Sequence, residues 1–494
     1  MSLPIELWDL PSPKLEFGDN AQFTDPKIGL RESGPYSLRF GAAHRSQVRV
    51  GLVGPLEMLE KADNWFSHCQ HFISSGKSNQ TTYPDFPGFQ KTFRATLDLA
   101  PQWRLAIDNH ELEQALQLKP IDRFQKVLEL YVHGIERIAN LDVRPDVVVC
   151  CLPDAVVRDC WSVTNHNLTP HELKKIWQQQ RQPTVQLSLF EISDVEEKAE
   201  DLLTRSFRRA LKAEVMKHRM PIQIATTNLL VDGKANQDAA TRAWNSCLGI
   251  FYKSGGIPWR LALDGPETCF VGISFHHLKT NKRHLVYSSL AQAFSTEGDG
   301  FALRGDFVPW DEDQGRTPHL SEEQAAYLVN QVLDEYRERT GHLPARVVLH
   351  KTSHYDAAEN FGFEHALQQI PIVEFVNLLP TKFRLVRQGS YPPKRGTLCR
   401  INGAVTYLFT TGYITEWETY PGAHIPVPIQ VITNHSSEIY RTAADILGLS
   451  RMNWNTARDT SGYPVTLRFS REVGGIMAEV GAEAKPNPSY RYYM

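Results

Sequence analysis

The sequence lacks the patterns that mark secreted, zinc-binding and membrane-spanning proteins. Its seven cysteines include no C-x-x-C pair and are scattered at positions 69, 150, 151, 160, 247, 269 and 399. An odd number at such spacing suggests neither a disulfide framework nor a zinc site. No apolar run approaches the roughly 18 residues that a membrane span needs, and the stretch MSLPIELWDL is not a basic segment followed by an apolar one. We therefore expect a cytoplasmic protein with reduced cysteines.

What is present is an ordinary mixture of residues for a folded protein of several domains. Apolar residues make up 41% of the 494 positions, charged residues 22% and aromatic residues 10%, which is far from the composition of disordered chains. Continuous apolar runs such as VVVCCLP (147–153) predict strands that helices cover on both faces. Because strand and helix patterns alternate, we predict an α/β protein with two domains that meet near residue 260.

The alternation rests on the following segments. Strands are expected at 49–54, 147–153, 221–226, 269–273, 345–351, 371–378, 383–388, 397–403, 405–412 and 464–470. Helices are expected at 56–70, 196–219, 236–252, 320–339, 437–448 and 471–481.

Charge is unevenly distributed, although the formal net charge is only −3. Six acidic residues lie within 191–201, whereas 201–260 contains ten Lys and Arg against four Asp and Glu. A second basic run comprises Lys382, Arg384, Arg387, Lys394, Arg395 and Arg400. Such local surplus suits a polyanion, because each cation that meets a phosphate releases condensed counterions. Arg209, Lys394 and Arg395 are thus candidate contacts to a nucleic-acid backbone; the alternative is that these are solvated faces of ordinary helices and loops.

Four polar side chains in the first basic region could converge on a terminal phosphate. A helix would present Arg208 and Lys212 on one face, because positions i and i+4 are neighbours on a helix surface. Gln223 lies on the following strand, and Lys253 ends a helix before the Gly-Gly pair at 255–256, which allows a tight turn. Adjacent like charges repel each other unless an anion lies between them. The pattern therefore predicts a phosphate pocket with charge-assisted hydrogen bonds from several sides.

The same segments carry a resemblance to a known family. KSGGIPW (253–259), with the helix–PIQ–helix arrangement before it, resembles the MID domain of Argonaute proteins, in which an aromatic or basic residue, Lys, Gln and Lys hold the 5′ phosphate of a guide strand. The resemblance assigns that role to Arg208, Lys212, Gln223 and Lys253. Many relatives have tyrosine in place of the arginine, and Arg209 is an alternative to Arg208 for this role.

The resemblance extends over nearly the whole chain. The segments VGISFHH, ARVVLHKTS, YPPKRGTLCR and MNWNTARDTSGYPVTLRFS are similar to successive PIWI segments, and the N-terminal region looks like the leader of short prokaryotic Argonautes, which lack N and PAZ domains. This implies a leader at 1–130 that packs on both domains, a Rossmann-like MID domain at 131–260 and an RNase H-like PIWI domain at 261–494. It also implies Mg²⁺ at the guide 5′ phosphate, held with the Met494 carboxylate.

Carboxylates are missing where a PIWI domain holds its catalytic metals. Nucleases of the RNase H fold bind two Mg²⁺ ions with three or four carboxylates. The corresponding positions are Ser274, after the apolar run of ETCFVGISFHH (267–277), Thr352 after ARVVLHK, and Ser470 at the end of TLRFS. A neutral hydroxyl is a weak ligand for a hard divalent cation. We therefore expect no slicing and no enzymatic activity in this chain.

Nearby acids leave an alternative open. Asp356 lies four residues beyond Thr352 and Glu472 two beyond Ser470. Three more acids, any of which could supply a mobile glutamate, are Glu297, Asp299 and Asp306. A metal-dependent guided nuclease with displaced carboxylates is therefore the second hypothesis, and a nucleic-acid binder that uses no guide is the third.

The resemblance implies a function in which recognition and activity are divided between two proteins. The chain would bind a 5′-phosphorylated guide, RNA rather than DNA, and recognise complementary single-stranded DNA through base pairing. Slicing-inactive short Argonautes pair with a separate protein that joins an APAZ region to an effector, which is a TIR or sirtuin-like NAD-consuming domain or a nuclease. The implied role is anti-plasmid and anti-phage defence, in which target binding activates the partner of a heterodimer, NAD is depleted and the infection is aborted.

Overall fold

A computed structural model describes most of the chain. The described residues are 4–164, 204–233, 237–262, 265–279, 284–295, 300–305, 307–309, 319–386, 389, 392–422, 424–434, 438–455, 462–480 and 485–494. The acidic segment 191–201, the first part of the helix expected at 196–219, and Glu297, Asp299 and Asp306 lie outside these ranges. Within them, no helix is both long enough and apolar enough to cross a membrane.

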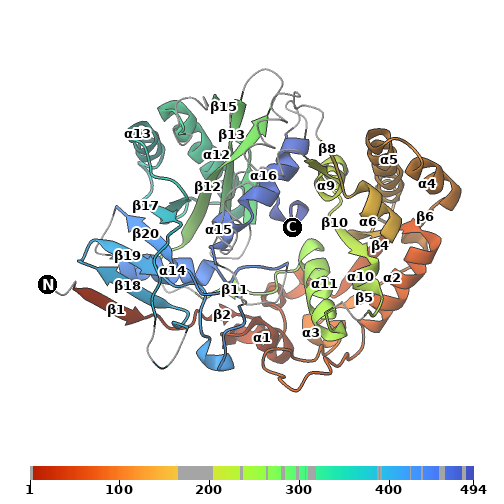
Figure 1. The fold of residues 1–494 in the computed structure, drawn as a ribbon, viewed down its shortest axis with the longest axis horizontal. Coiled ribbons are helices and arrows are strands. Elements are labelled where there is room, and N and C mark those ends of the chain that lie inside the picture. Colours follow the sequence, from red (N-terminus) through yellow and green to blue (C-terminus); the bar gives the residue numbers. More distant parts are fainter. Residues whose placement is uncertain are drawn as a thin grey trace.

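A ten-stranded sheet forms the larger body of the molecule (Figure 1). Its order is β1 (Ile5–Asp9), β18 (Thr397–Ile401), β19 (Val405–Leu408), β20 (Ile429–Thr433), β17 (Ile372–Leu379), β16 (Arg346–Lys351), β12 (Thr268–Lys279), β13 (His284–Ser295) and β14 (Gly300–Leu303), with β15 (Phe307–Pro309) also on β13. The central strands β12, β16 and β17 are parallel, and the other pairs are antiparallel. This mixed sheet agrees with the predicted RNase H-like fold.

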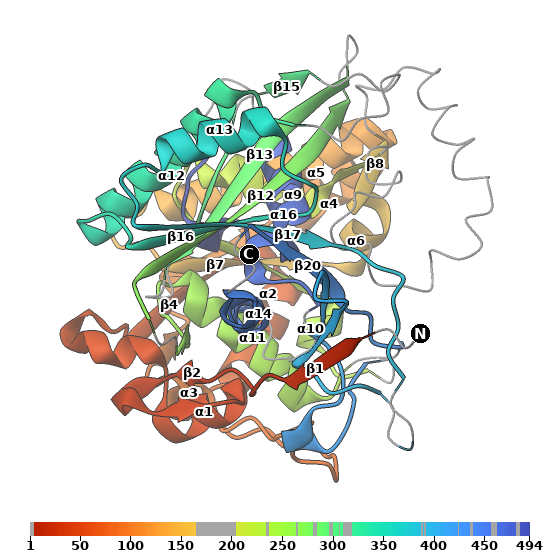
Figure 2. The ribbon, with the colours of Figure 1, turned by 90° about the vertical axis from the view of Figure 1, so that its left-hand side faces the viewer.

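Helices cover both faces of the large sheet. On one face, α12 (Glu322–Thr340) and α13 (Ala357–Ala366) pack against alternate residues of β12 and β16, such as Val271 and Leu349; Figure 2 shows this pair of helices beside β12 and β13. The other face meets α14 (Ile439–Leu449), α15 (Val465–Arg468) and α16 (Ser470–Glu479). A capping box at Ser321 begins α12, and Gly341 ends it in the left-handed region at φ 85°.

A second sheet, entirely parallel, forms the smaller body on the right of Figure 1. Its order is β10 (Ile222–Thr226), β7 (Val147–Leu152), β4 (Gln47–Pro55) and β5 (Thr96–Asp98), with β6 (Arg104–Ile107) also on β4. Every residue of β7 is buried, because helices lie on both faces. One face meets α5 (Pro120–Ala139) and α9 (Phe207–Met216), and the other meets α2 (Leu56–His68) and α11 (Ala239–Lys253). This is the predicted Rossmann-like arrangement.

The division predicted at residue 130 runs through the second sheet. Strand β4 belongs to the region assigned to the leader, yet it pairs with β7 along Val50–Val53 in the middle of the sheet. Residue 130 therefore does not separate two structural units. The segment before β4 joins both bodies: β1 pairs with β18, whereas β2 (Leu15–Glu16) pairs with β3 (Gln22–Phe23) and with β11 (Arg260–Leu261).

Shorter elements complete the described part of the chain. They are α1 (Pro26–Ser33), α3 (Phe89–Phe93), α4 (Asn109–Leu116), α6 (Asp154–Cys160), β8 (Ser162–Thr164), β9 (Thr204–Ser206) and α10 (Thr227–Leu230).

Two expected strands are wrong. Residues 464–470 form α15 and the start of α16 instead. Pro464 is extended and precedes the helical turn, and the consecutive residues Val465, Thr466 and Leu467 are all buried, which a strand with one exposed face does not allow. The alternation of apolar and polar residues in PVTLRFS resembled a strand over too short a stretch to decide. Residues 383–386 are irregular, and Phe383 stacks on Tyr407 of β19 at 4.3 Å between ring centroids instead of joining the sheet.

Buried charges tie the large sheet to α14. The guanidinium of Arg346 on β16 binds both carboxylate oxygens of Glu374 on β17, at 2.9 Å each, and lies 2.7 Å from Asp445 on α14. All three residues are buried. Burial raises the pKa of Asp445 to about 6, although Arg346 lowers it in part. Arg346 therefore compensates two carboxylates that would otherwise be left in a dry environment.

Candidate nucleic-acid interface

Helix α9 carries two of the predicted phosphate ligands. Its residues Phe207, Ala210 and Leu211 pack into the core against α5 and the parallel sheet, which leaves the adjacent stripe to Arg208 and Lys212. Lys212 is buried, with 3% of its surface exposed, whereas the Arg208 side chain keeps 38%. One cation is therefore fixed inside the protein, and the other reaches toward the surface.

The other two ligands come from neighbouring elements. Gln223 lies on β10, and Lys253 is the last residue of α11, where a positive charge is favoured by the helix dipole. Asp238 begins α11 by accepting a hydrogen bond from the Thr241 N–H at 2.8 Å. The Lys253 ammonium donates to the side-chain oxygen of Gln223. Strand and helix thus bring together two residues that are thirty positions apart.

Electrostatics shows that the three cations lie close to one another. Burial lowers the pKa of Lys212 well below its usual range, and the charges of Arg208 and Lys253 lower it further. Burial, followed by the charge of Arg208, lowers the pKa of Lys253 to about 7. The structure therefore brings Arg208, Lys212, Gln223 and Lys253 into one group, which we term the cation cluster. Such a cluster becomes favourable when an anion enters it.

Tyr493 and Met494 supply main-chain acceptor oxygens within the cation cluster. The Lys212 ammonium donates to the carbonyl oxygen of Tyr493 at 2.8 Å and to the main-chain oxygen of Met494, which is 3% exposed. Figure 1 shows this end of the chain between α9, α11 and α16. Residues 485–494, which we term the C-terminal tail, are held by a hydrogen bond from the Tyr493 hydroxyl to Asn487 O at 2.7 Å. These oxygens lie beside the predicted phosphate ligands, and oxygen is the ligand type that Mg²⁺ prefers; the Mg²⁺ site stays a prediction.

Two further arginines flank the cluster and were not found from the sequence. A Cβ atom on Gly255, which has φ 105°, would lie 3.3 Å from the Arg491 guanidinium and 3.9 Å from that of Arg45. Arg491 also donates to the Ser489 hydroxyl at 3.1 Å, and Arg45 to Asp146 at 3.2 Å. Arg491 lies three residues before Met494. Because Met494 was predicted to lie at the phosphate, this closeness in sequence could have indicated Arg491 as a further candidate. Arg45 lies some two hundred positions from the rest, and no local pattern indicates it.

The remaining backbone candidates each have an acidic group near them. Arg209 points at α16, where its guanidinium occupies the space beside Gly475, and it lies 3.8 Å from Glu472. Arg208 also reaches Glu472, at 3.5 Å, but it is the arginine whose charge acts on both lysines.

Lys394 and Arg395 have carboxylates near them. Lys394 forms an ion pair with Asp9 of β1 at 3.0 Å. Burial lowers the pKa of Arg395 to about 10, against the opposing effects of Glu416 and Asp25. A nucleic-acid backbone would therefore have to compete with these acidic groups for both residues.

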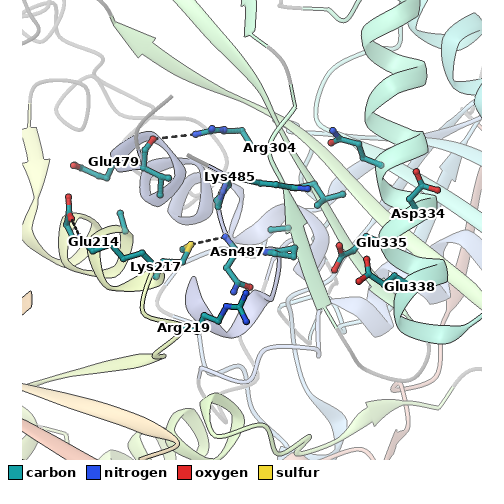
Figure 3. Close-up of a pocket in the computed structure, with 18 of the residues that line it drawn as sticks. Glu214, Lys217, Arg219, Arg304, Asp334, Glu335, Glu338, Glu479, Lys485 and Asn487 are labelled. Carbon is teal, nitrogen blue, oxygen red and sulfur yellow. Dashed lines mark hydrogen bonds and ion pairs between the residues drawn. The ribbon is translucent and has the colours of Figure 1, made fainter. Parts of the chain in front are cut away.

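A cleft of about 1000 Å³ lies between the end of α9 and α12 (Figure 3). Lys217 and Arg219 line the α9 side, and Asp334, Glu335 and Glu338 line the α12 side. The C-terminal tail forms the wall between them, and the Asn487 N–H lies 3.2 Å from the Met216 sulfur. Among the described residues that line it, none belongs to the cation cluster. The tail therefore contacts both the cleft and the cation cluster.

The predicted positions of lost acids lie on neighbouring elements. Strands β12 and β16 are parallel with Ile273 opposite Lys351, so Ser274 and Thr352 follow side by side at the same end. Ser274 is buried, Thr352 is half-buried, and Ser470 is buried at the start of α16. Ser274 and Thr352 therefore lie close together, and α15 and α16 lie over β12; the assignment of these residues as former catalytic positions stays a prediction.

Helix α15 closes the sheet surface next to these positions. Gly272 lies directly under α15, and a Cβ atom there would collide with the Thr466 carbonyl oxygen. The Thr466 hydroxyl lies 2.9 Å from His350 Nδ1 on the neighbouring strand. Burial lowers the pKa of His350 to about 3, so its ring is neutral at physiological pH. Uncharged groups therefore fill this part of the surface.

The described carboxylates closest in sequence are engaged elsewhere. Asp356 begins α13 and forms a capping box with Glu359. Glu359 binds Lys351 at 2.5 Å and His319 at 3.1 Å inside the protein, and Glu472 faces Arg208 and Arg209. In the described ranges, no three His, Cys, Asp or Glu side chains gather closely enough to hold a metal ion.

Comparison with solved structures identifies the fold of this chain, whereas comparison of its sequence finds no match. No family model and no curated protein matches the sequence. Among solved structures, the chain resembles Clostridium butyricum Argonaute bound to a guide DNA and a 19-mer target DNA, with a TM-score of 0.61 and 13% identity over 99% of this chain. It also resembles Aquifex aeolicus Argonaute, with a TM-score of 0.52 and 13% identity over 100% of this chain.

The match covers only 55% and 57% of those two Argonaute chains, so this chain spans about half their length. The chain has the MID–PIWI fold of Argonaute proteins, and the predicted fold class is confirmed. At this identity the likeness concerns the fold alone. What the chain binds has to be argued from its own residues.

Proposed function

We propose that this chain works as a short Argonaute that binds the 5′ phosphate of a guide RNA and uses the guide to recognise complementary single-stranded DNA. The observation that carries the proposal is the cation cluster, in which Arg208, Lys212, Gln223 and Lys253 converge from two helices and a strand. Three cations in one partly buried group repel one another, and a phosphate carrying about −1.5 to −2 charges relieves that repulsion. A guide whose first phosphate lies there would extend its backbone outward.

Mg²⁺ fits beside this phosphate. The Met494 carboxylate and phosphate oxygens would hold it, and the ion would neutralise negative charge where the two groups meet. The chain's own contribution is to fix the Met494 end, because Lys212 and the buried Tyr490 and Tyr493 hold the C-terminal tail in place.

Binding of matched 5′-phosphorylated and 5′-hydroxyl RNA tests the proposal directly. The wild-type chain should prefer the phosphorylated guide, and Lys212→Ala with Lys253→Ala should remove that preference. Lys217→Ala is the matched control, because Lys217 is an exposed lysine at the end of the same helix with Glu214 as its partner at 3.3 Å. A preference that survives the double substitution within about tenfold, or roughly 1.4 kcal/mol, would contradict the assignment.

We also propose that the chain does not cut the target. Ser274, Thr352 and Ser470 supply hydroxyls where two metal ions need carboxylates, and the described acids nearby are held by cations or by a helix cap. Incubation of the guide-loaded chain with matched DNA in Mg²⁺ or Mn²⁺ should leave the DNA intact. Cleavage that requires both metal and matched sequence would establish the guided nuclease instead.

In this proposal, target recognition serves as a signal inside the cytoplasm. The resemblance to short Argonautes supports an APAZ-containing effector as the partner of a heterodimer, with a TIR or sirtuin-like NAD-consuming domain and defence against plasmids or phages as the role. Activation requires that guide and target bind the active heterodimer more tightly than the resting one. NAD loss that needs this chain, the protein of the adjacent gene, guide and target together would support the arrangement. NAD levels that stay constant, with nucleic acid degraded instead, would assign a nuclease effector.

A further inference from the structure

Strand β1 forms one outer edge of the large sheet and presents large apolar side chains to solvent. It lies at the rim of the molecule beside β18 (Figure 1). Ile5 is 52% exposed and Leu7 55% exposed, and both project from the same face because side chains alternate along a strand. Trp8 lies on the opposite face, where it packs against the core. An apolar pair thus stands at the border of the sheet with about half of its surface exposed.

The hydrogen-bond pattern shows which backbone groups of β1 point outward. Asn402 N–H donates to Pro4 O at 2.9 Å, and Leu10 N–H donates to Gly396 O at 2.9 Å. Bonded and non-bonded positions alternate along an antiparallel pair, and the register runs without a shift from Ile5–Ile401 to Asp9–Thr397. The even-numbered residues 4 to 10 therefore bond to β18. The N–H and C=O groups of Ile5, Leu7 and Asp9 point away from the sheet.

This edge has only part of the usual protection against strand pairing, because it is short and carries Glu6 and Asp9 but has no lysine, internal proline or bulge. Proteins shield edge strands with lysine, proline, bulges or a covering segment. Ile5–Asp9 contains neither Lys nor Pro, and its register has no bulge. Strand β14, near the opposite border of the sheet, is covered, because the C-terminal tail forms a bridge from Ser489 to Phe301 and accepts the Ala302 N–H at 2.8 Å. Among the described residues, no strand pairs with the outer edge of β1.

We infer that the outer edge of β1 is a docking site for an extended segment of a partner protein, which adds a further strand to the ten-stranded sheet. Main-chain groups of Ile5, Leu7 and Asp9 would supply the affinity, as in other cases of strand addition. The complementary segment has apolar side chains opposite Ile5 and Leu7. It has a polar or basic residue opposite Asp9, whose carboxylate already attracts Lys394 at 3.0 Å. The inference relies on the proposed function only for the existence of a separate protein partner.

A second copy of this chain fits the edge less well. An antiparallel pair of two β1 strands would be centred on Leu7, because Ile5, Leu7 and Asp9 carry the outward-facing main-chain groups. The pairing would set each Ile5 opposite the Asp9 of the other copy, so the apolar side chains would meet only at Leu7. A partner segment whose sequence alternates to match the edge satisfies both residues.

Hydrogen–deuterium exchange on the purified full chain tests the state of the edge. The amides of Leu7 and Asp9 should exchange rapidly, and those of Glu6 and Trp8 slowly. If the outward amides are already protected in a monomer, another part of this chain covers them and the inference is wrong. If they are protected only in a dimer, the occupant is a second copy, and the inference is equally wrong.

Substitutions then test docking with the protein encoded by the adjacent gene as the probe. Leu7→Pro removes an outward N–H while leaving the bonds to β18, because proline is tolerated where an edge strand faces solvent. Leu7→Lys keeps the backbone and adds an edge charge. Each should weaken the complex by at least about tenfold. Ile121→Lys, at an exposed isoleucine on α5, is the matched control and should not weaken it.

Guide binding, measured on the same samples, separates the two proposals. Weaker complexes with unchanged affinity for 5′-phosphorylated RNA support docking at β1. A complex that both Leu7 variants leave unchanged overturns the inference while the proposed function stands. No complex with the wild-type chain overturns docking and the effector pairing together, and guide affinity then reports on the cation cluster alone.

Discussion

The affinity for a 5′-phosphorylated guide should fall as the pH rises above 7. Lys253 in the free protein has a pKa of about 7, because it is buried and lies near the charge of Arg208. A bound phosphate favours the charged ammonium and therefore raises that pKa. A group whose pKa rises on binding takes up a proton, so binding is favoured below the free-state pKa and weakens above it. Lys212, whose pKa is also lowered, acts in the same direction.

The size of the effect follows from the protonated fraction of Lys253. With a pKa of about 7, half of the free protein carries the charge at pH 7 and about one tenth at pH 8, so affinity should fall about fivefold over that unit and about tenfold over the next. The phosphate does not cause this fall, because its second ionisation lies near pH 6 and is complete above 7. Mg²⁺ should reduce the fall, since it supplies positive charge that the lysines have lost.

Fluorescence anisotropy with labelled RNA from pH 6.5 to 8.5 measures this dependence, with and without Mg²⁺. A 5′-hydroxyl guide of the same sequence should show no comparable fall. Lys253→Arg keeps its charge throughout this range, so its curve should be less steep than that of the wild type, with Lys212 causing the remaining fall. A constant affinity for the phosphorylated guide between pH 7 and 8.5 would refute the reasoning, as would an equal fall with the hydroxyl guide.

Three other perturbations have definite expected outcomes. Residues added after Met494, whose main-chain oxygen is buried against a lysine, should weaken binding of the phosphorylated guide by about tenfold or more, as the loss of a charge-assisted contact predicts; anisotropy that matches the unextended chain would argue against a role for the tail. Gly272→Ala should lower the free energy of unfolding in urea titrations by about 1–3 kcal/mol, because α15 leaves no room for a methyl group. The control Gly462→Ala, in open space, should change it by less than about 0.5 kcal/mol. Equal effects of the two substitutions would show that α15 moves freely. Arg346→Met should cost about 3–5 kcal/mol, because it removes the cation beside buried Asp445 and leaves Glu374 with Arg441 alone. A loss below about 1 kcal/mol would mean that Asp445 becomes protonated or hydrated.

The cation cluster could be predicted because most of its geometry is local. Arg208 and Lys212 lie one helical turn apart, and the apolar pattern around them already fixes which stripe of α9 is buried. Gln223 lies within β10, whose apolar and β-branched residues mark it as a strand in the sequence. Lys253 is the last residue of α11, and a Gly-Gly pair follows it closely. Once both helices pack on one parallel sheet, these side chains have little choice of position.

Non-local features could not be predicted in the same way. RVGLVG was correctly expected to be a strand. Its pairing partner in β7 lies nearly a hundred residues away, and neither segment carries a pattern that identifies the other as its partner. Arg45, just before β4, comes near Gly255 across an even longer separation in sequence. The period-2 pattern of PVTLRFS was overridden by the tertiary contact of Thr466 with β12 and β16. Tertiary contacts determine the structure of these segments, whereas the sequence patterns indicate only their local conformational preference.

The pairing of β1 with β18 also has a consequence for synthesis. Asp9 cannot pair before its partner Thr397, almost 400 residues later in the chain, has been synthesised. A ribosome that adds about 5–20 residues per second needs roughly 20–80 s to reach Thr397. The parallel sheet is complete once β10 has emerged, so it can form while the first strand is still waiting. During that interval, both edges of an apolar strand are open to chaperones, to other nascent chains and to whatever subunit is translated alongside.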